Sequence, residues 1–458
     1  MTASVDWVEN DAPREVHDRA ETVRPGEVAK AMAQPDRRAP VGFVQRMARR
    51  VTAGRLSQLR DGRLSIVDSS GTLEFGNESA ELSASIEVRD PGFYLDVLLG
   101  GSLAAGEAYV RGDWDCDDLM SLFRVLTLDG ETGNQLDGPS SAVWSWTRRL
   151  AHRLRANTRR GSRRNIEAHY DLGNEFFELM LDDTLAYSSG VFTSPTCGLR
   201  EASVEKMDRI CRKLDLQPAD QVLEIGTGWG GWALHAAQHY GCRVTTTTIS
   251  QRQYETARRR IDAAGLGDRI TLLNADYRDL TGKYDKLVSI EMIEAVGHQY
   301  FDTFFGRCGE LLEPHGRMAL QCIVMPDRNY AKYLRSVDFI QRYVFPGGCL
   351  PSLGAIMEST ARSGDLRTVH CEDFGSHYAR TLAAWRSAFE SRLADVRRLG
   401  YGEEFIRLWR YYLCYCQAAF EARYLGLVQL VLERPGCRHD PYAIVRAAAA
   451  ATRQGIES

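Results

Sequence analysis

The stretch Val222-Leu-Glu-Ile-Gly-Thr-Gly-Trp-Gly230 decides the fold of this chain. A short apolar run, typical of a buried strand, leads into a series of glycines and then into a segment that predicts a helix. Glycines at a strand-to-helix turn let the backbone bend tightly and approach a ligand closely. The motif therefore predicts an α/β domain whose ligand lies at this turn.

The sequence around this motif alternates between strand and helix patterns. The expected strands are Gln221–Ile225, Arg243–Ile249, Arg269–Asn274, Lys286–Ile290 and Arg317–Ile323, with helices near 230–240, 251–264 and 298–312. An irregular insert at about 325–365, a long helix at 403–422 and a last strand at 425–432 should follow. This order predicts a Rossmann-like, doubly wound α/β domain over residues 166–437.

The residues near the glycines distinguish between two kinds of ligand. Gly226-x-Gly228-x-x-Gly231 also matches the dinucleotide fingerprint, which needs an acidic residue about 20 positions later to bind the ribose. No Asp or Glu occurs between Ile225 and Tyr254. Glu224 instead precedes the strand end, as in the E/DxGxGxG pattern of S-adenosylmethionine enzymes. The pattern favours a class I methyltransferase over a nicotinamide enzyme.

The amino-terminal part differs in texture from this domain. Residues 1–40 are polar without a sustained period and predict a disordered tail, and residues 438–458 predict a second tail. Strand patterns at 62–68, 72–75 and 82–88, followed by apolar helix-like segments, predict a small α+β domain at 41–135.

Residues 136–165 form a basic linker with two tryptophans, Trp144 and Trp146. Eight arginines lie between Arg148 and Arg164, with no acidic residue among them. The segment is either a solvated linker or a polybasic surface for anionic phospholipid, where tryptophan settles at headgroup level. The net charge of −4 does not favour a nucleic-acid partner.

Composition limits the remaining classes. The 11 cysteines form no CxxC and no Cys/His cluster with zinc spacing, so we expect no metal site and a reducing compartment. No run approaches 18 uninterrupted apolar residues, and the charged start lacks a signal peptide's apolar core. We expect a cytoplasmic protein, peripheral on the inner membrane face.

Separated motifs over about residues 41–435 resemble the cyclopropane-fatty-acyl-phospholipid synthase family and its methyl-branching relatives. Besides the glycine turn, they are His169–Asn174, Ala186–Ser189, Thr248–Gln253, Ser289–Gly297, Tyr343–Pro351, Phe374–Tyr378 and Tyr412–Cys416. The segment Phe-Pro-Gly-Gly-Cys-Leu-Pro within 343–351 is the most particular of them. The resemblance implies that residues 41–135 bind lipid and that S-adenosylmethionine is the cofactor.

The resemblance also implies which residues hold the cofactor. The expected set is Tyr187, Ser188, Glu224, Gly226, Gly228, Gly230, Thr248, Gln253, Asp276 and Tyr277. Within it the glycines would cradle the methionine part, Thr248 and Gln253 would approach the ribose, and Asp276 and Tyr277 would flank the adenine.

In this family an alkene takes the methyl group, and the resulting carbocation loses a proton to a bound bicarbonate. A Cys, a Glu, a His, a Tyr and an Ile main-chain group hold that anion. Glu294, Ile323 and Tyr378 match, whereas Ser189 replaces the cysteine and Gln321 replaces the histidine. Both replacements can donate hydrogen bonds to an anion. The family's active-site cysteine corresponds to Cys416, for which a purely structural role is the alternative.

The resemblance thus implies methylation of C=C bonds in the acyl chains of membrane phospholipids. Cyclopropane and methylene- or methyl-branched products both stay open, as do a homodimer and a reductase partner. A small-molecule N-methyltransferase and a non-catalytic lipid-binding protein are the competing hypotheses. The amino-terminal domain and basic linker argue against the first, since a soluble amine requires neither.

Overall fold

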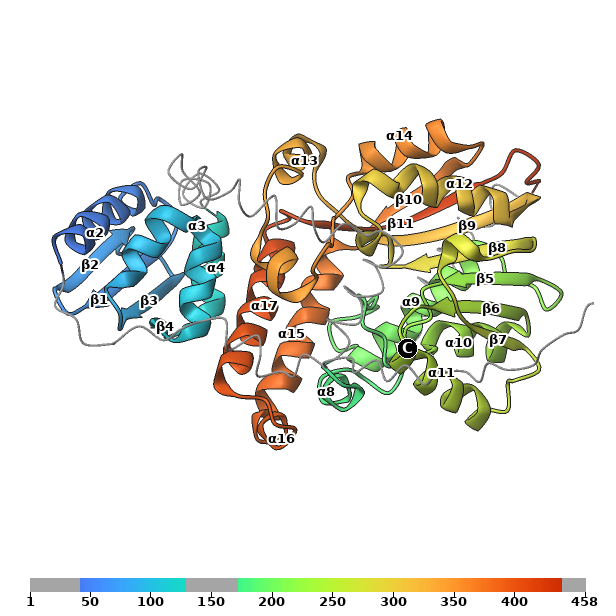
Figure 1. The fold of residues 1–458 in the computed structure, drawn as a ribbon, viewed down its shortest axis with the longest axis horizontal. Coiled ribbons are helices and arrows are strands. Elements are labelled where there is room, and N and C mark those ends of the chain that lie inside the picture. Colours follow the sequence, from blue (N-terminus) through green and yellow to red (C-terminus); the bar gives the residue numbers. More distant parts are fainter. Residues whose placement is uncertain (1–41, 129–171, 439–458) are drawn as a thin grey trace, which may run out of the picture. The chain divides into compact units, whose positions relative to one another are not determined.

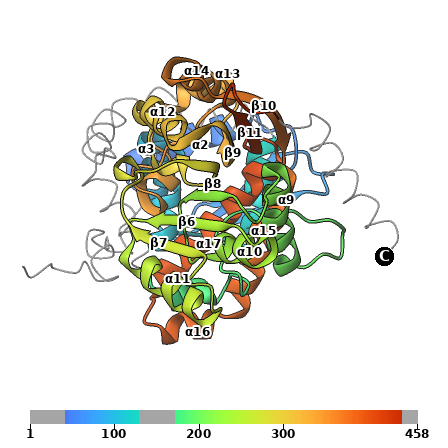
Figure 2. The same ribbon diagram turned by 90° about the vertical axis from the view of Figure 1, so that its right-hand side faces the viewer.

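The larger sheet of the molecule has seven strands. The structure is a computed structural model that describes residues 42–128 and 172–438. The strands are β5 (Gln221–Ile225), β6 (Arg243–Thr248), β7 (Ile270–Asn274), β8 (Tyr284–Ile290), β9 (Leu312–Val324), β10 (Arg367–Asp373) and β11 (Gly426–Glu433). Their order is β10-β11-β9-β8-β5-β6-β7, which can be followed from top to bottom in Figure 1; Figure 2 shows the sheet turned by 90°. Strands β5 to β9 are parallel and β11 runs antiparallel to β9, as in a Rossmann-like fold.

Helices cover both faces of this sheet. One core joins the sheet to α12 (Phe301–Leu311) and α14 (Leu353–Ser363). The other joins it to α9 (Leu199–Leu214), α10 (Gly231–Tyr240) and α11 (Gln251–Ala263). Consecutive strand residues alternate between the cores: Leu223 belongs to the first and Val222 to the second. Burial on both faces explains the near-continuous apolar strands and confirms the predicted doubly wound class.

A smaller four-stranded sheet lies in the amino-terminal part. Its strands are β1 (Arg63–Asp68), β2 (Gly71–Gly76), β3 (Ser83–Val88) and β4 (Trp114–Cys116), in the order β2-β1-β3-β4. The accompanying helices are α2 (Phe43–Leu56), α3 (Gly92–Arg111) and α4 (Leu119–Leu128). Helix α3 has a kink at Gly101, which has φ 65°. The expected tails and the basic linker at 136–165 lie outside the described residues.

The expectation of an irregular insert at 325–365 is wrong. This segment contains α13 (Asp327–Tyr333), a π-helical turn η5 (Ile340–Val344) and α14. Met325, Tyr333 and Cys349 bury one another in a small core of their own. Packing of this kind stabilises an ordered structure that the local sequence pattern does not predict.

We call residues 42–128 the smaller lobe and residues 172–438 the larger lobe. The remaining elements of the larger lobe are mostly helical. They are α8 (Asn174–Glu178), α15 (Gly375–Ser391), α16 (Leu393–Arg398), α17 (Glu403–Glu421) and the short turns η2 (Tyr277–Asp279), η3 (Ile293–Ala295) and η4 (His298–Tyr300). The long helix expected at 403–422 is confirmed as α17. No described helix is both long and apolar enough to cross a membrane.

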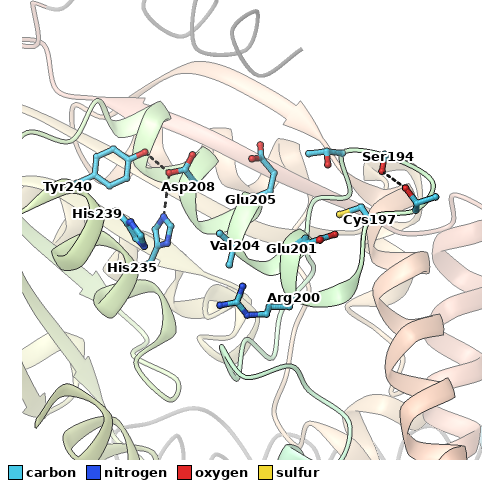
Figure 3. Close-up of a pocket in the computed structure, with 12 residues that line it drawn as sticks. Ser194, Cys197, Arg200, Glu201, Val204, Glu205, Asp208, His235, His239 and Tyr240 are labelled. Atoms are coloured by element: carbon cyan, nitrogen blue, oxygen red, sulfur yellow. Dashed lines mark hydrogen bonds and ion pairs between the residues drawn. The ribbon is translucent and has the colours of Figure 1, made fainter. Parts of the chain in front are cut away.

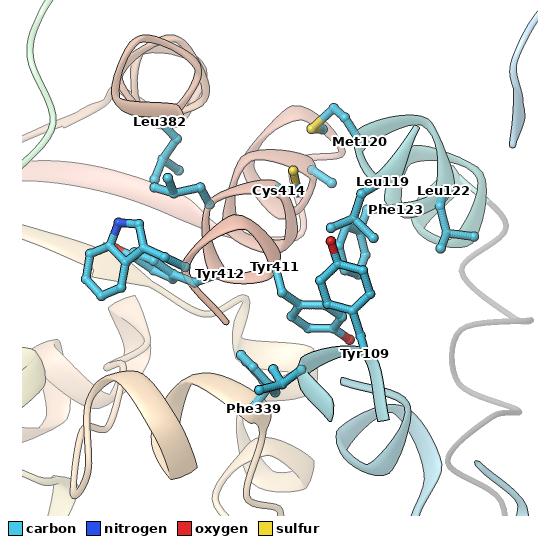
Figure 4. Close-up of a cluster of buried hydrophobic side chains, with 14 of the residues drawn as sticks. Tyr109, Leu119, Met120, Leu122, Phe123, Phe339, Leu382, Tyr411, Tyr412 and Cys414 are labelled. Carbon is cyan, nitrogen blue, oxygen red and sulfur yellow. The ribbon is translucent and has the colours of Figure 1, made fainter. Parts of the chain in front are cut away.

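Helix α17 connects the smaller lobe to the larger one through aromatic packing (Figure 4). The Tyr411 ring lies 4.5 Å from Phe339, 4.9 Å from Phe123 and 5.6 Å from Tyr109, measured between centroids. Phe339 directly precedes η5, and Tyr109 and Phe123 belong to α3 and α4. Such tilted and edge-on pairs stabilise packing beyond the burial of their area. The smaller lobe therefore rests on the helix that also carries Tyr412 and Cys416.

Candidate active site

The glycine turn after β5 has the backbone of a ligand cradle. Gly226, Gly228 and Gly230 have φ angles of 105°, 53° and 86°, which residues with a Cβ rarely adopt. A Cβ built on Gly228 would meet no atom within 4 Å. That open space belongs to a cavity, so a side chain there would occupy ligand volume. The turn therefore leaves room for a ligand beside Gly228.

The cavity at this turn has a volume of about 340 Å³ and two differently built ends. We call the part at β5, β6 and β7 the cofactor end; it includes Gly226, Gly228, Glu224, Thr248, Gln253, Asp276 and Tyr277. We call the part at β8, β9, α15 and α17 the carboxylate end; it includes Glu291, Glu294, Ile323, Tyr378, Tyr412 and Cys416. Tyr187, Ser188 and Lys206 also line this cavity.

Polar side chains of the cofactor end hold one another in place. The Thr248 hydroxyl donates to Gln253 Oε1 at 2.8 Å, and Asp276 forms an ion pair with Arg278 at 2.6 Å. The Tyr277 ring packs edge-on against Phe304. Glu224 is buried and accepts a hydrogen bond from Thr246 Oγ1 at 2.5 Å. Burial raises the pKa of Glu224 to about 8.

Glu291 is the centre of the carboxylate end. Its carboxylate accepts hydrogen bonds from Ser189 N at 2.9 Å, Gln321 Nε2 at 2.8 Å and Tyr378 OH at 2.7 Å. The residue follows β8 with a φ of 49°, a left-handed conformation that is unusual for a residue other than glycine. Strained backbone of this kind concentrates at functional sites.

The amide of Gln321 is itself oriented by neighbours from two other elements. Gln429, its register partner on β11, donates from Nε2 to Gln321 Oε1 at 2.9 Å. Lys213 Nζ in turn donates to Gln429 Oε1 at 2.7 Å. Because Gln321 Oε1 is engaged in this way, its Nε2 faces Glu291. The three side chains are all buried and fix one donor of the Glu291 site.

Glu294 lies near Glu291 but has a different environment. Its Oε1 accepts a hydrogen bond from Ile323 N at 2.7 Å, while its buried Oε2 has no hydrogen-bond partner within the described residues. Burial, and secondarily the charge of Glu291, raise the pKa of Glu294 to about 8. At neutral pH Glu294 is therefore mainly a protonated, uncharged carboxyl group.

Lys206 is a buried amine whose charged form interacts with Glu291. It projects from α9, and its Nζ donates to Ser188 Oγ at 2.6 Å. Burial lowers the pKa of Lys206, and burial raises the pKa of Glu291, which the Lys206 charge partly opposes. A buried cation near a buried carboxylate keeps part of that carboxylate ionised.

Aromatic rings form the wall next to Glu291. Tyr187 stacks on Trp385 with centroids 5.1 Å apart, and its hydroxyl lies 3.0 Å from that of Tyr412. Tyr378 stacks on Phe420 at 4.5 Å. Cys416 lies in the same wall, and burial raises the pKa of its thiol. The wall therefore offers aromatic faces and an uncharged sulfur.

The predicted site residues divide into two groups in the structure. Most line the one cavity, whereas Ser189, Gln321 and Gly230 do not. We expected Ser189 and Gln321 to face a bound anion; instead they lie behind Glu291, and the Ser189 hydroxyl donates to Gly190 O at 3.0 Å. Ile323 N, expected to hold the same anion, donates to Glu294. The reason is that groups of the chain itself already accept these hydrogen bonds, a main-chain carbonyl for Ser189 and carboxylates for Gln321 and Ile323.

Sequence reasoning missed two residues of this site, Glu291 and Lys206. A signal for Glu291 existed, because an acidic residue directly after a buried parallel strand lies where doubly wound folds bind ligands. Lys206 gave no comparable signal, since a single lysine in a charged helical segment is usually solvent-exposed.

A second, open pocket of about 800 Å³ lies beside α9 and α10 (Figure 3). There Asp208 accepts a hydrogen bond from Tyr240 OH at 2.7 Å and contacts His235 Nε2 at 3.4 Å. The pocket contains no part of the glycine turn and none of the predicted site residues. Despite its smaller volume, the cavity at the glycine turn is therefore the candidate active site. The described residues contain no cluster of three or more side chains suited to a metal ion.

Known proteins resemble this chain along most of its length. The model of the mycolic acid cyclopropane synthetase family matches residues 157–430. Tuberculostearic acid methyltransferase UfaA1 of Mycobacterium tuberculosis is 38% identical over 73% of this chain and 80% of its own length. Cyclopropane-fatty-acyl-phospholipid synthase of Escherichia coli is 36% identical over 77% of this chain and 88% of its own length.

Solved structures give the same result for the fold. Cyclopropane synthase MmaA2 of Mycobacterium tuberculosis superposes with a TM-score of 0.56 at 30% identity, covering 59% of this chain and 98% of MmaA2. Coclaurine N-methyltransferase superposes with a TM-score of 0.53 at 21% identity, covering 69% of this chain and 95% of that protein. The latter likeness concerns the fold alone.

Proposed function

Because the chain belongs to the mycolic acid cyclopropane synthetase family, we propose that it methylates C=C bonds in the acyl chains of membrane phospholipids, with Glu291 as the proton acceptor. It is an S-adenosylmethionine-dependent methyltransferase that acts on unsaturated acyl chains. The proposal adds the phospholipid form of the substrate, a peripheral place on the membrane surface, and the residues that act.

The first step requires close positioning and exclusion of water. S-adenosylmethionine supplies an electrophilic methyl group on a sulfonium, and the C=C bond is a weak nucleophile that must be held in line with it. The glycine turn holds the cofactor, and the wall of Tyr187, Tyr378 and Phe420 receives the acyl chain. As the new C–C bond forms and the C–S bond breaks, positive charge appears on the neighbouring acyl carbon. Desolvated aromatic faces each stabilise such a cation by about 2 kcal/mol.

A bound bicarbonate does not fit the residues of this chain. The groups that would hold it are Ser189, Gln321, Tyr378, Glu294 and the main chain of Ile323. Gln321 Nε2 and Tyr378 OH already donate to Glu291, the Ser189 hydroxyl donates to Gly190 O, and Ile323 N donates to Glu294. An additional anion would also lie against the buried charge of Glu291. We therefore assign the proton-accepting role to the chain itself.

The observation that carries this assignment is the set of three hydrogen bonds to Glu291. They fix a carboxylate in the cavity wall, in the environment that the resemblance assigns to an anion. Burial raises its pKa toward the working range of a general base. Glu291 takes a proton from the carbocation, and the C–H electron pair forms the new bond of the product. Loss of a proton from the added methyl group closes a cyclopropane; loss from a neighbouring carbon after a hydride shift leaves a branched alkene.

Glu294 and Lys206 complete the charge balance of the site. The uncharged Glu294 carboxyl accepts from Ile323 N without adding a second negative charge beside Glu291. Lys206 compensates the ionised form of Glu291. The surroundings of the two carboxyl groups differ: three hydrogen bonds and the charge of Lys206 favour the ionised form of Glu291, whereas burial and the charge of Glu291 favour the protonated form of Glu294.

A pair of glutamine variants tests the function and the assignment together. Purified protein is incubated with S-adenosylmethionine and vesicles of unsaturated phospholipid, and the acyl chains are analysed by mass spectrometry for one added CH₂. We expect Glu291→Gln to lower kcat at least about 100-fold, because an amide cannot accept the proton. Glu294→Gln preserves the acceptor for Ile323 N and an uncharged group, so we expect a loss below about tenfold.

Two further measurements test the function and the role of Glu291 separately. Cofactor affinity, measured by calorimetry, should be the same in both variants and the parent protein. Removing dissolved bicarbonate should leave turnover of the parent unchanged. Strong dependence on added bicarbonate, or equal losses in both variants, would show that Glu291 is not the base. No added CH₂ on any unsaturated lipid would contradict the function itself.

A further inference from the structure

Helix α2 exposes an apolar stripe on the side away from its own core. Ala48, Thr52 and Leu56 are its buried residues. Phe43, Val44, Met47 and Val51 are 72, 59, 51 and 40% exposed. Phe43, Met47 and Val51 follow one another at intervals of four residues, so they lie along one face of the helix. These four side chains are nearly half of the nine large exposed apolar side chains in the described part of the chain.

The charges of α2 are all positive. It contains Arg46, Arg49, Arg50 and Arg55, and no acidic residue occurs between Gly42 and Arg60. Arg49 is bonded to Asp68 at 2.6 Å and ties the helix to β1. Arg46 and Arg50 are exposed and adjoin the apolar stripe in sequence and on the helix surface. An apolar stripe bordered by arginines is the pattern of a helix that lies in the interface of an anionic membrane.

The lobe that carries α2 is bonded to the wall of the active-site cavity. Helix α2 packs beside α3, and both α3 and α4 pack on α17. Across this junction Arg407 donates to Tyr109 O, Arg124 pairs with Glu421 at 2.6 Å, and Tyr343 OH donates to Glu107 at 2.6 Å. Helix α17 provides Tyr412 and Cys416 to the cavity. A surface bound by α2 is thus held to the helix that borders the acyl site.

We propose that α2 is the helix by which this protein docks on the surface of an anionic phospholipid bilayer, with its apolar stripe among the acyl chains and its arginines at the phosphates. The inference rests on the proposed function, since the acyl substrate would lie in that bilayer. A second copy of the chain fits the stripe less well, because a two-fold contact would bring the arginines of one α2 against those of the other. The bilayer offers acyl chains to the stripe and phosphate groups to the exposed Arg50.

Binding of the full chain to vesicles tests this surface. The vesicles are phosphatidylcholine alone or phosphatidylcholine with phosphatidylglycerol, and binding is measured by co-sedimentation at several salt concentrations. We expect the parent protein to prefer anionic vesicles and to lose affinity as salt rises. Phe43→Asp with Met47→Asp should weaken binding at least about tenfold. The matched control is Val369→Asp with Leu399→Asp, which changes exposed apolar residues elsewhere and should bind like the parent.

A second variant and two further measurements keep the outcomes distinct. Arg46→Gln with Arg50→Gln changes no apolar residue and should reduce the preference for anionic vesicles. All variants should methylate unsaturated lipid dispersed in detergent at the parent rate. If neither the parent nor any variant methylates the lipid in detergent, that result would contradict the proposed function and not the docking surface. Unchanged vesicle binding of both α2 variants would overturn the proposal. So would a dimeric parent that becomes monomeric in the Phe43/Met47 variant, because α2 would then be a subunit interface.

Discussion

The two ends of the cavity are built in different ways. At the centre of the cofactor end is a contiguous main-chain turn, where Gly228 leaves space for a ligand. The carboxylate end depends on donors from β9, α15 and the main chain before α9, which meet at Glu291 directly after β8. Changes at the first end should act on binding, and changes at the second should act on turnover and its pH dependence. Different parts of one cavity therefore bind the cofactor and accept the proton.

The largest effect expected from this comparison is at Gly228. Gly228→Val should abolish measurable S-adenosylmethionine binding, because the added side chain enters the open space of the cavity and the φ of 53° disfavours a branched residue. Calorimetric titration with the cofactor measures the loss. Gly265→Val is the matched control, since Gly265 has a φ of 66° and equally open surroundings but does not line the cavity. Equal affinity in both variants would remove the glycine turn from the cofactor site.

A smaller effect is expected at the carboxylate end, in the pH profile rather than in binding. The acid limb of kcat/KM should report the ionisation of Glu291, whose pKa burial raises and Lys206 lowers. Lys206→Met removes the opposing charge, so the pKa of Glu291 should rise further. More alkaline pH is then needed to ionise the base, and the acid limb should move upward by about one pH unit.

The control for this variant is another lysine that binds only main chain. Lys286 Nζ donates to Leu214 O at 2.8 Å and does not line the cavity. Lys286→Met should therefore leave the acid limb in place. A limb that stays unchanged in Lys206→Met, or moves to lower pH, would show that Glu291 does not control the titration. Both profiles are recorded at saturating cofactor, so altered binding does not enter.

The cofactor end could be predicted because its information is local. Gly226, Gly228 and the preceding apolar strand are adjacent in sequence, and their spacing predicts the tight strand-to-helix turn. The strands β5 to β9 and α17 were predictable for the same reason, since each has its own hydrophobic pattern. Helices α13 and α14 were not, because their order depends on packing between distant segments.

The carboxylate end could be predicted only in part. The resemblance points to Glu294, Tyr378 and Ile323, but it cannot state which acceptor each donor uses. That choice depends on non-local contacts, such as the pairing of β11 with β9 that places Gln429 against Gln321. Once Gln321 Nε2 faces Glu291, the expected anion has lost one of its donors. A pattern of residue types therefore identifies the neighbourhood of a site more readily than its hydrogen-bond partners.

The smallest effect on turnover is expected for a change of Cys416, a residue of the carboxylate end that we expect not to take part in the reaction. The resemblance marks it as an active-site cysteine, and its side chain does line the cavity. However, burial raises the pKa of the thiol, so it stays protonated at neutral pH and is neither a base nor a strong nucleophile. Cys416→Ala should then keep turnover within about threefold of the parent, with a loss of stability of about 1 kcal/mol from the vacated sulfur. Acyl-chain analysis and thermal unfolding measure the two effects. If Cys416→Ala lost as much turnover as Glu291→Gln and kept a normal melting temperature, the sulfur would take part in the reaction. The wall around it would then do more than enclose the cation.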